Sequence, residues 1–191
     1  METSRVDFVG TYVGTTAPKT TETVNRAMGG VLFIDEAYQL MDKSGAGGYG
    51  AEAIDTLVAL LENHRKDFVC IVAGYTEEME DFLNQNSGLK SRFPTVIEFE
   101  DYTLDELCQI FELTVSQNGY VVTPAASEAA RAYIATCYQS KDFANARGVR
   151  NLVTQRFIPH QNSRIADSGI LEISREVTEE ELATILPEDI Y

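Results

Sequence analysis

Two adjacent carboxylates, Asp35 and Glu36, directly follow the short apolar run at residues 31–34. A run this short and rich in Val, Ile and Phe predicts a strand buried on both faces, as in a parallel sheet covered by helices. Ligands of such sheets bind at the carboxyl ends of the strands, where these acids lie. One acid can hold a nucleotide's Mg²⁺ ion, and the other can orient or deprotonate an attacking water. The alternative is a helix N-terminus, whose dipole favours two acids without any ligand.

Composition narrows the classes of protein that are possible. The 191 residues allow one domain, or a domain with a small satellite, and the net charge of −15 argues against general affinity for nucleic acid. We find no secretory signal and no run long enough to span a membrane, so we expect a cytoplasmic protein. Cys70, Cys108 and Cys137 are odd in number and widely spaced, which is typical of small core residues in a reducing compartment. His64 and His160 lack partners at ligand spacing, which argues against zinc.

Strands and helices are predicted to alternate in the first part of the chain. A Thr-rich start with Pro at 15–18 opens a helix, and apolar residues at i, i+3, i+4 and i+7 from Ile54 to Leu61 indicate an amphipathic helix. A short acidic helix includes Phe82, and a loop at 84–88 precedes Arg92. The predicted strands are 6–14, 31–34, 68–74 and 95–99. This alternation favours a doubly wound parallel sheet.

After residue 103 the pattern becomes helical. Thr103 and Thr178 each open a capping box, with a glutamate three residues later, and Thr123 precedes a proline at another helix start. A further helix begins near residue 145 and is kinked at Pro159. Residues 170–173 are a short strand candidate, and the last helix stops before residue 187. We therefore predict an α/β domain at 1–103 and a helical subdomain at 104–191.

Six phrases occur in an order that resembles a known family: FVGTYVG at 8–14, TAPKT at 16–20, AMGGVLFIDEAY at 27–38, VAGY at 72–75, GLKSRF at 88–93 and FANARGVRN at 143–151. Together they resemble an AAA+ ATPase module, in particular the family of CbbX, the red-type Rubisco activase, and of stage V sporulation protein K. The resemblance implies an AAA+ P-loop NTPase parallel sheet followed by a small helical lid, with ATP and Mg²⁺ as cofactors.

The resemblance also assigns roles to single residues. Asp35 and Glu36 match Walker B, which holds Mg²⁺ through water and activates the hydrolytic water. Thr76 lies near the sensor-1 position, with a plain helix N-cap as the alternative. Arg92 matches the arginine finger that reaches the γ-phosphate held by a neighbouring subunit, where an always-charged fork suits phosphate oxygens; the alternative is a solvated loop charge. Arg147 matches sensor 2, which reaches back from the lid to the nucleotide.

Tyr12, Val13 and Gly14 resemble the aromatic–hydrophobic–glycine pore loop of ring-forming AAA+ motors. An aromatic side chain grips a threaded peptide by apolar contact, and glycine lets the loop move. The alternative is an edge strand with Tyr12 packed on the core. The resemblance thus implies a homo- or hetero-oligomeric ring, such as a hexamer, that acts on a protein substrate, without a nucleic-acid or membrane partner.

The chain departs from the family in one respect, because the sequence has no Gly-x-x-x-x-Gly-Lys-Ser/Thr pattern. The glycine-rich stretch at 44–50 lacks the Gly-Lys-Ser/Thr ending and does not join a strand directly to a helix. In the family the phosphate loop precedes the pore loop, within a strand–loop–helix unit of roughly 30 residues. Without that unit we expect the sheet to lack a central strand and to expose apolar edges.

A truncated or mis-started gene, an expressed fragment and a subunit without independent ATPase activity each account for this departure. Two functions therefore stand side by side. The chain is the greater part of an ATPase that remodels proteins in a ring, or it is a non-catalytic ring partner that supplies Arg92 and the pore loop to an active homologue. The sequence does not separate Rubisco activation from an anchoring role in sporulation or secretion machinery.

Overall fold

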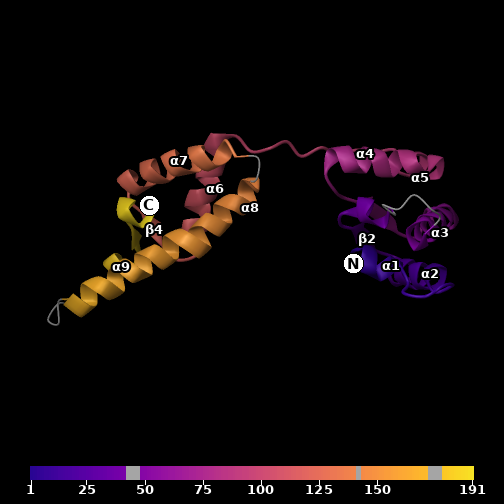
Figure 1. Cartoon of the computed structure of the whole chain (residues 1–191), viewed down its shortest axis with the longest axis horizontal. Helices are drawn as coiled ribbons and strands as arrows, with labels where there is room; N and C mark the ends of the chain where they lie inside the picture. Colours follow the sequence, from indigo (N-terminus) through magenta and orange to yellow (C-terminus); the bar gives the residue numbers. More distant parts are fainter. Residues whose placement is uncertain (42–47, 141–142, 172–177) are drawn as a thin grey trace. The chain divides into compact units, whose positions relative to one another are not determined.

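The chain folds into two compact units, Met1–Glu98 (unit 1) and Phe99–Tyr191 (unit 2), in the computed structural model shown in Figure 1. The structure describes residues 1–41, 48–140, 143–171 and 178–191. The glycine-rich stretch singled out above lies largely outside the described residues. The division between the units falls shortly before residue 103, where the sequence pattern turns helical. Each unit has its own apolar core.

A parallel three-stranded sheet forms the centre of unit 1. Its order is β1 (Glu2–Thr3), β2 (Val31–Ile34) and β3 (Val69–Val72), and both neighbouring pairs are parallel. The 3-10 turn η1 (Ala37–Leu40) follows β2 directly. The α/β class and the parallel sheet predicted from the sequence are therefore confirmed.

Helices α2 (Thr16–Arg26) and α3 (Tyr49–Asn63) cover one face of this sheet. Leu32 and Ile34 of β2 point to that face and have no exposed surface. Cys70 lies on the same face of β3, and its burial raises the pKa of the thiol to about 12, which keeps it protonated and inert. The amphipathic helix predicted from 54 to 61 is α3, whose buried residues include Ile54 and Leu57.

The prediction that these strands are buried on both faces is wrong. Val31 is 44% exposed, and Val69 and Ile71 of β3 are 57% and 44% exposed. Side chains alternate between the two faces of a strand, so these residues point away from α2 and α3. The opposite face of the sheet and the outer edge of β3 are therefore open in the part of unit 1 that the structure describes. An apolar run indicated a strand, but local sequence does not say which faces are covered.

The strand predicted at 6–14 is also wrong. The chain there forms the short helix α1 (Arg5–Phe8) and then a turn. The carboxylate of Asp7 accepts a hydrogen bond from the backbone N–H of Ser4 at 2.9 Å, which caps the first turn. Phe8 is fully buried, whereas the β-branched Val6 is 72% exposed. Capping and the burial of one phenylalanine outweigh the local β propensity.

No regular strand forms at residues 95–99, contrary to the prediction. The side chains of Val96, Ile97 and Phe99 are 70%, 75% and 93% exposed. A strand needs a hydrogen-bonded neighbour, and among the described residues none pairs with this segment. The apolar residues of this segment have β propensity, but propensity without a pairing neighbour does not form a strand.

The loop predicted at 84–88 is reduced to a single residue. Helix α4 (Thr76–Gln85) extends to Gln85, and helix α5 (Ser87–Arg92) begins two residues later. Asn86 separates the two helices, and its side-chain oxygen accepts a hydrogen bond from the N–H of Gly88 at 2.7 Å. Arg92 therefore ends a helix instead of lying in a loop.

Unit 2 consists mainly of helices, as predicted. They are α6 (Leu104–Gln117), α7 (Pro124–Tyr138), α8 (Asn145–Leu152), α9 (Ile158–Leu171) and α10 (Glu179–Ala183). Both capping boxes are confirmed: the side-chain oxygens of Thr103 and Thr178 lie 3.3 and 3.2 Å from the amides that they cap. None of the helices within the described residues is long and apolar enough to cross a bilayer.

Two smaller elements of unit 2 differ from the prediction. The irregularity expected at Pro159 is a π-helical turn, η2 (Val153–Phe157), just before α9. Residues 170 and 171 belong to α9 instead of a strand, and 172–173 lie outside the described residues. After α10 the chain forms β5 (Thr184–Ile185), which pairs in parallel with β4 (Val121–Val122), and the turn η3 (Pro187–Asp189).

Substitutions on the two faces of the sheet should differ in cost. Leu32→Ala removes a fully buried side chain and should lower the free energy of unfolding by about 2–5 kcal/mol. Ile71→Thr keeps a β-branched residue on the open face and should change it by less than about 1 kcal/mol. Urea unfolding followed by circular dichroism measures both. Equal losses would mean that the second face is covered.

Candidate functional site

The two acids of the sequence motif lie where β2 and β3 end together. The N–H of Ala73 donates to the carbonyl of Ile34 at 2.9 Å, and the N–H of Ala37 donates to the carbonyl of Ala73 at 3.0 Å. The chain therefore leaves β2 through Asp35 and Glu36 while it stays bonded to the end of β3. This is the edge at which parallel sheets bind ligands.

Asp35 presents a carboxylate to solvent at this edge. Its Oδ1 accepts a hydrogen bond from the backbone N–H of Glu36 at 3.0 Å. Among the described residues, no hydrogen bond or ion pair engages Oδ2. A free carboxylate oxygen beside a second acid suits Mg²⁺, which binds one or two carboxylates together with water and phosphate oxygens. The donors present therefore fit the metal that the sequence implied.

Glu36 adopts a left-handed backbone conformation, with φ of 47° and ψ of 48°. This region is costly for residues other than glycine, and such strain concentrates at functional sites. The carboxylate accepts a hydrogen bond from the side-chain amide of Gln39. Desolvation raises the pKa of Tyr38, and the charge and hydrogen bonding of Glu36 raise it further. The motif predicted the acid but not this backbone or these two partners.

Tyr38 connects the ends of the two strands. A Cβ atom at Gly74 would lie 2.7 Å from the Tyr38 ring, so only glycine allows this approach. The rings of Tyr38 and Tyr75 stand 6.4 Å apart, tilted by 38°. The only sequence signal for this arrangement was the Gly-Tyr pair directly after β3. Together these contacts fix the turn that carries Glu36.

Thr76 is the first residue of α4 and is exposed. The N-cap position belongs to Tyr75, whose side chain makes no capping hydrogen bond. The alternative reading of Thr76 as a helix N-cap therefore does not hold. The hydroxyl of Thr76 makes no hydrogen bond within the described residues. Thr76 follows the end of β3, where Val72 pairs with Ile34 of β2.

Arg92 ends α5, and its side chain is 25% exposed. Its Nη2 lies 3.3 Å from Oε2 of Glu62, which belongs to α3. Its Nη1 donates to the carbonyl of Gly88 at 3.0 Å and to the hydroxyl of Ser91 at 2.9 Å. The alternative of a solvated loop charge does not describe this side chain. Glu62 was not singled out by the sequence, since an acid on an exposed helix face carries no signal by itself.

Arg147 lies in unit 2, on helix α8, and is exposed, as is Arg150. The residues between and beside them, Ala146 and Val149, face the core of unit 2. A Cβ atom at Gly148 would lie 2.6 Å from the ring of Phe143, so this glycine packs against the aromatic residue that precedes the helix. The structure thus groups Asp35 with Glu36 and Thr76 in unit 1, and it holds Arg147 in the other unit.

Tyr12 and Val13 form an exposed turn, with 75% and 88% of their side-chain surface open to solvent. The hydroxyl of Thr15 donates to the carbonyl of Tyr12 at 2.7 Å and closes the turn. Gly14 has a φ of 79°, and a Cβ at Gly10 would collide with the Thr15 hydroxyl. The alternative of an edge strand with Tyr12 packed on the core is therefore excluded.

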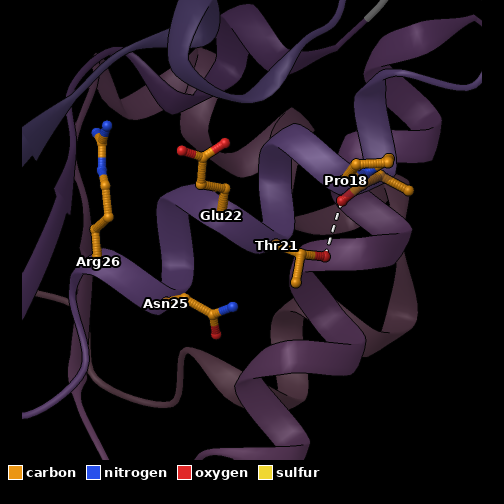
Figure 2. Close-up of a pocket in the computed structure, with 6 residues that line it drawn as sticks. Pro18, Thr21, Glu22, Asn25 and Arg26 are labelled. Atoms are coloured by element: carbon orange, nitrogen blue, oxygen red, sulfur yellow. Dashed lines mark hydrogen bonds between the residues drawn. The ribbon is translucent and has the colours of Figure 1, made fainter.

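A hollow on the surface of α2 is not part of this site. Figure 2 shows its lining residues along a single helix: Ala17, Pro18, Thr21, Glu22, Asn25 and Arg26. The dashed line is the hydrogen bond from the Thr21 hydroxyl to the Ala17 carbonyl, at 2.8 Å. None of the residues predicted to do chemistry lines it.

Two known protein families together match almost the whole chain. Residues 1–101 match the ATPase family associated with various cellular activities (AAA), and residues 103–191 match the AAA lid domain. The chain therefore belongs to the AAA ATPase family.

Its similarity to particular members extends over almost its whole length. It is 44% identical to protein CbbX of Cereibacter sphaeroides and 44% identical to a CfxQ homologue of Trieres chinensis, over 98% of this chain in both cases. It is 42% identical to the chloroplastic ribulose bisphosphate carboxylase/oxygenase activase of Cyanidioschyzon merolae. The chain spans 59%, 62% and 62% of these three relatives, respectively.

Solved structures show the same fold at low sequence identity. The FIGL-1 AAA domain superposes with a TM-score of 0.62 at 13% identity, covering 99% of this chain and 59% of that one. A RuvB mutant of Thermotoga maritima superposes with a TM-score of 0.53 at 18% identity, covering 95% of this chain and 50% of that one.

The left-handed backbone at Glu36 predicts an unusual order of stabilities. Glu36→Gly relieves the strain and should stay close to the wild type, whereas Glu36→Val should lower the free energy of unfolding by about 1–2 kcal/mol more, since a β-branched residue fits this region poorly. The controls are Glu80→Gly and Glu80→Val, at an exposed position inside α4. There the order should reverse, because glycine is a poorer helix former than valine. Thermal unfolding of the four variants measures both orders. The same order at both positions would contradict the strained backbone.

Proposed function

We propose that this chain carries the hydrolytic half of an AAA+ ATPase site that drives the remodelling of a protein substrate in a ring. Asp35 would hold Mg²⁺ through water, and Glu36 would orient and deprotonate the attacking water. Thr76 would help to place that water, and Arg92 would serve the nucleotide of a neighbouring subunit. Arg147 would reach the nucleotide from the lid.

One observation carries the proposal: the paired acids lie at the carboxyl end of β2, beside a strand whose outer edge is open. The phosphate loop of this family follows a strand and opens a helix. A strand that paired with the open edge of β3 would deliver such a loop next to Asp35 and Glu36. Its helix would cover the exposed face formed by Val31, Val69 and Ile71. The exposed apolar face and the unpaired edge of β3 would accommodate such a strand and helix, which supports the proposal.

The residues present match one half of the nucleotide chemistry. The carboxylates of Asp35 and Glu36 suit the metal and the water, whereas the sequence supplies no Gly-x-x-x-x-Gly-Lys-Ser/Thr cradle for the phosphates. ATP bound with Mg²⁺ would supply the phosphoryl group and its leaving group. Hydrolysis would therefore need a phosphate loop in addition to these two acids.

Ring assembly and substrate handling complete the proposal. Tyr12 and Val13 are exposed on a closed turn, as a loop that grips a peptide by apolar contact requires. One relative is named an activase of ribulose bisphosphate carboxylase/oxygenase, which makes that enzyme the first substrate to test. The second candidate is a non-catalytic ring partner that offers Arg92 and this loop to an active homologue. It is favoured by the exposed turn at Tyr12 and Val13 and by Arg92 at the end of α5, because neither feature needs a nucleotide bound to this chain.

Restoring the phosphate loop tests the first candidate. We expect the chain, extended at residue 1 by the strand–phosphate-loop–helix segment of Cereibacter sphaeroides CbbX, to hydrolyse ATP and to stop when Mg²⁺ is chelated. Glu36→Gln should lower turnover by about 10²-fold or more while ATP binding persists, because it removes the base but keeps the shape. Glu77→Gln, which removes an exposed acid from α4, is the matched control. The mechanism would be contradicted if the Glu36→Gln variant of the extended chain bound ATP and hydrolysed it as fast as the unsubstituted extended chain.

The second candidate gives a different result with the chain as it stands. It should bind no ATP alone, yet raise the turnover of an active homologue with which it forms mixed rings. Arg92→Ala should then remove the stimulation, by about 10³-fold at the shared sites. Stimulation that survives Arg92→Ala would contradict this candidate.

A further inference from the structure

Helix α5 is seated on one face of helix α3. The side-chain amide of Asn86 donates to Oδ1 of Asp55 at 2.9 Å at the start of α5. A Cβ atom at Gly88 would lie 2.8 Å from Cγ1 of Val58, so the backbone of α5 touches α3 at this point. Positions 55, 58 and 62 follow one another along the same face of a helix. The third of these positions, Glu62, meets the last residue of α5.

That third contact engages the guanidinium group of Arg92. Nη2 faces the carboxylate of Glu62 at 3.3 Å, and Nη1 is held by the carbonyl of Gly88 and the hydroxyl of Ser91. Nε is buried and has no acceptor among the described residues. The side chain is thus folded back on its own subunit, with its charged end against α3.

This arrangement blocks the geometry that phosphate recognition needs. A guanidinium binds a phosphate best with two parallel N–H groups, along the edge of Nε and Nη2 or the edge of Nη1 and Nη2. Both edges share Nη2, which has one N–H on each edge and faces the carboxylate of Glu62 at 3.3 Å. Gly88 and Ser91 engage Nη1, Glu62 faces Nη2, and Nε is buried, so neither edge is open for a bidentate contact in this arrangement.

We propose that Glu62 is a positioning residue that keeps Arg92 retracted until a phosphate group on a neighbouring subunit displaces its carboxylate. The inference rests on the proposed role of Arg92 as the arginine finger. Glu62 would then couple the reach of Arg92 to the presence of nucleotide across the subunit interface. An unoccupied neighbour leaves the ion pair intact.

The ion pair is weak enough to be exchanged. The side chain of Glu62 is 55% exposed, and ion pairs that are this open to water contribute little to stability because solvent screens them. A polyphosphate carries more negative charge than a carboxylate and accepts both N–H groups of one edge. Its contact with Arg92 is therefore the stronger one, and Glu62 adds a penalty that the incoming anion must overcome.

The test uses the chain alone and inorganic tripolyphosphate as the probe. The variants are Glu62→Gln, the charge-matched control Glu77→Gln, and Glu62→Gln combined with Arg92→Gln. Binding is measured at low salt. For the chains that contain Arg92 it is followed by the NMR signal of the Arg92 side-chain Nε–H, and for the variant that lacks this arginine it is followed by calorimetry. We expect Glu62→Gln to bind tripolyphosphate about fivefold more tightly than the wild type, the equivalent of about 1 kcal/mol. Glu77→Gln should match the wild type, and the double variant should lose the gain.

Two results overturn the proposal: Glu62→Gln without tighter binding, including no detectable binding, or a double variant that keeps the gain. Because Glu62 is exposed, we expect these variants to fold, which circular dichroism checks. Failure of the proposed function looks different. If the proposed role of Arg92 is wrong, Arg92→Ala will leave the ATP turnover of the extended chain unchanged. That outcome does not depend on how Glu62→Gln affects tripolyphosphate binding.

Discussion

The parallel pairing of β2 with β3 is the contact on which the rest of unit 1 depends. It holds Ile34 opposite Val72, so the chain leaves both strands at one edge, and Asp35 and Glu36 emerge beside the segment that leads to Thr76. The same pairing sorts the side chains into a face packed on α2 and α3 and a face left open. The position of the acids and the open surface next to them are therefore two consequences of one register.

Much of this could be predicted because the signals are local. The capping boxes at Thr103 and Thr178 each lie within a single turn, and the apolar face of α3 follows from helical spacing alone. The acids after β2 were found from their position behind an apolar run. These features depend on neighbours in sequence, so the sequence is sufficient to locate them.

What sequence reasoning missed depends on distant partners. The apolar residues of β3 and of 95–99 predict strands, but coverage and pairing come from elements elsewhere in the fold. The left-handed backbone at Glu36 requires the contacts of Tyr38 with the end of β3, and the ion pair of Arg92 requires the seating of α5 on α3. In each case the residue types were compatible with several structures, and packing against a remote element selected one.

We propose that the outer edge of β3 receives the strand that precedes the phosphate loop. In a parallel strand, successive N–H groups point to opposite sides, and those of Val69 and Ala73 donate to β2. The amides of Cys70 and Val72 therefore point to the open edge. Hydrogen exchange measured by NMR tests the claim most directly: these two amides should exchange rapidly in this chain and become protected in the chain extended by the phosphate-loop segment, while the amide of Ile71 is slow in both. Rapid exchange at Cys70 and Val72 in an extended chain that binds ATP would contradict it.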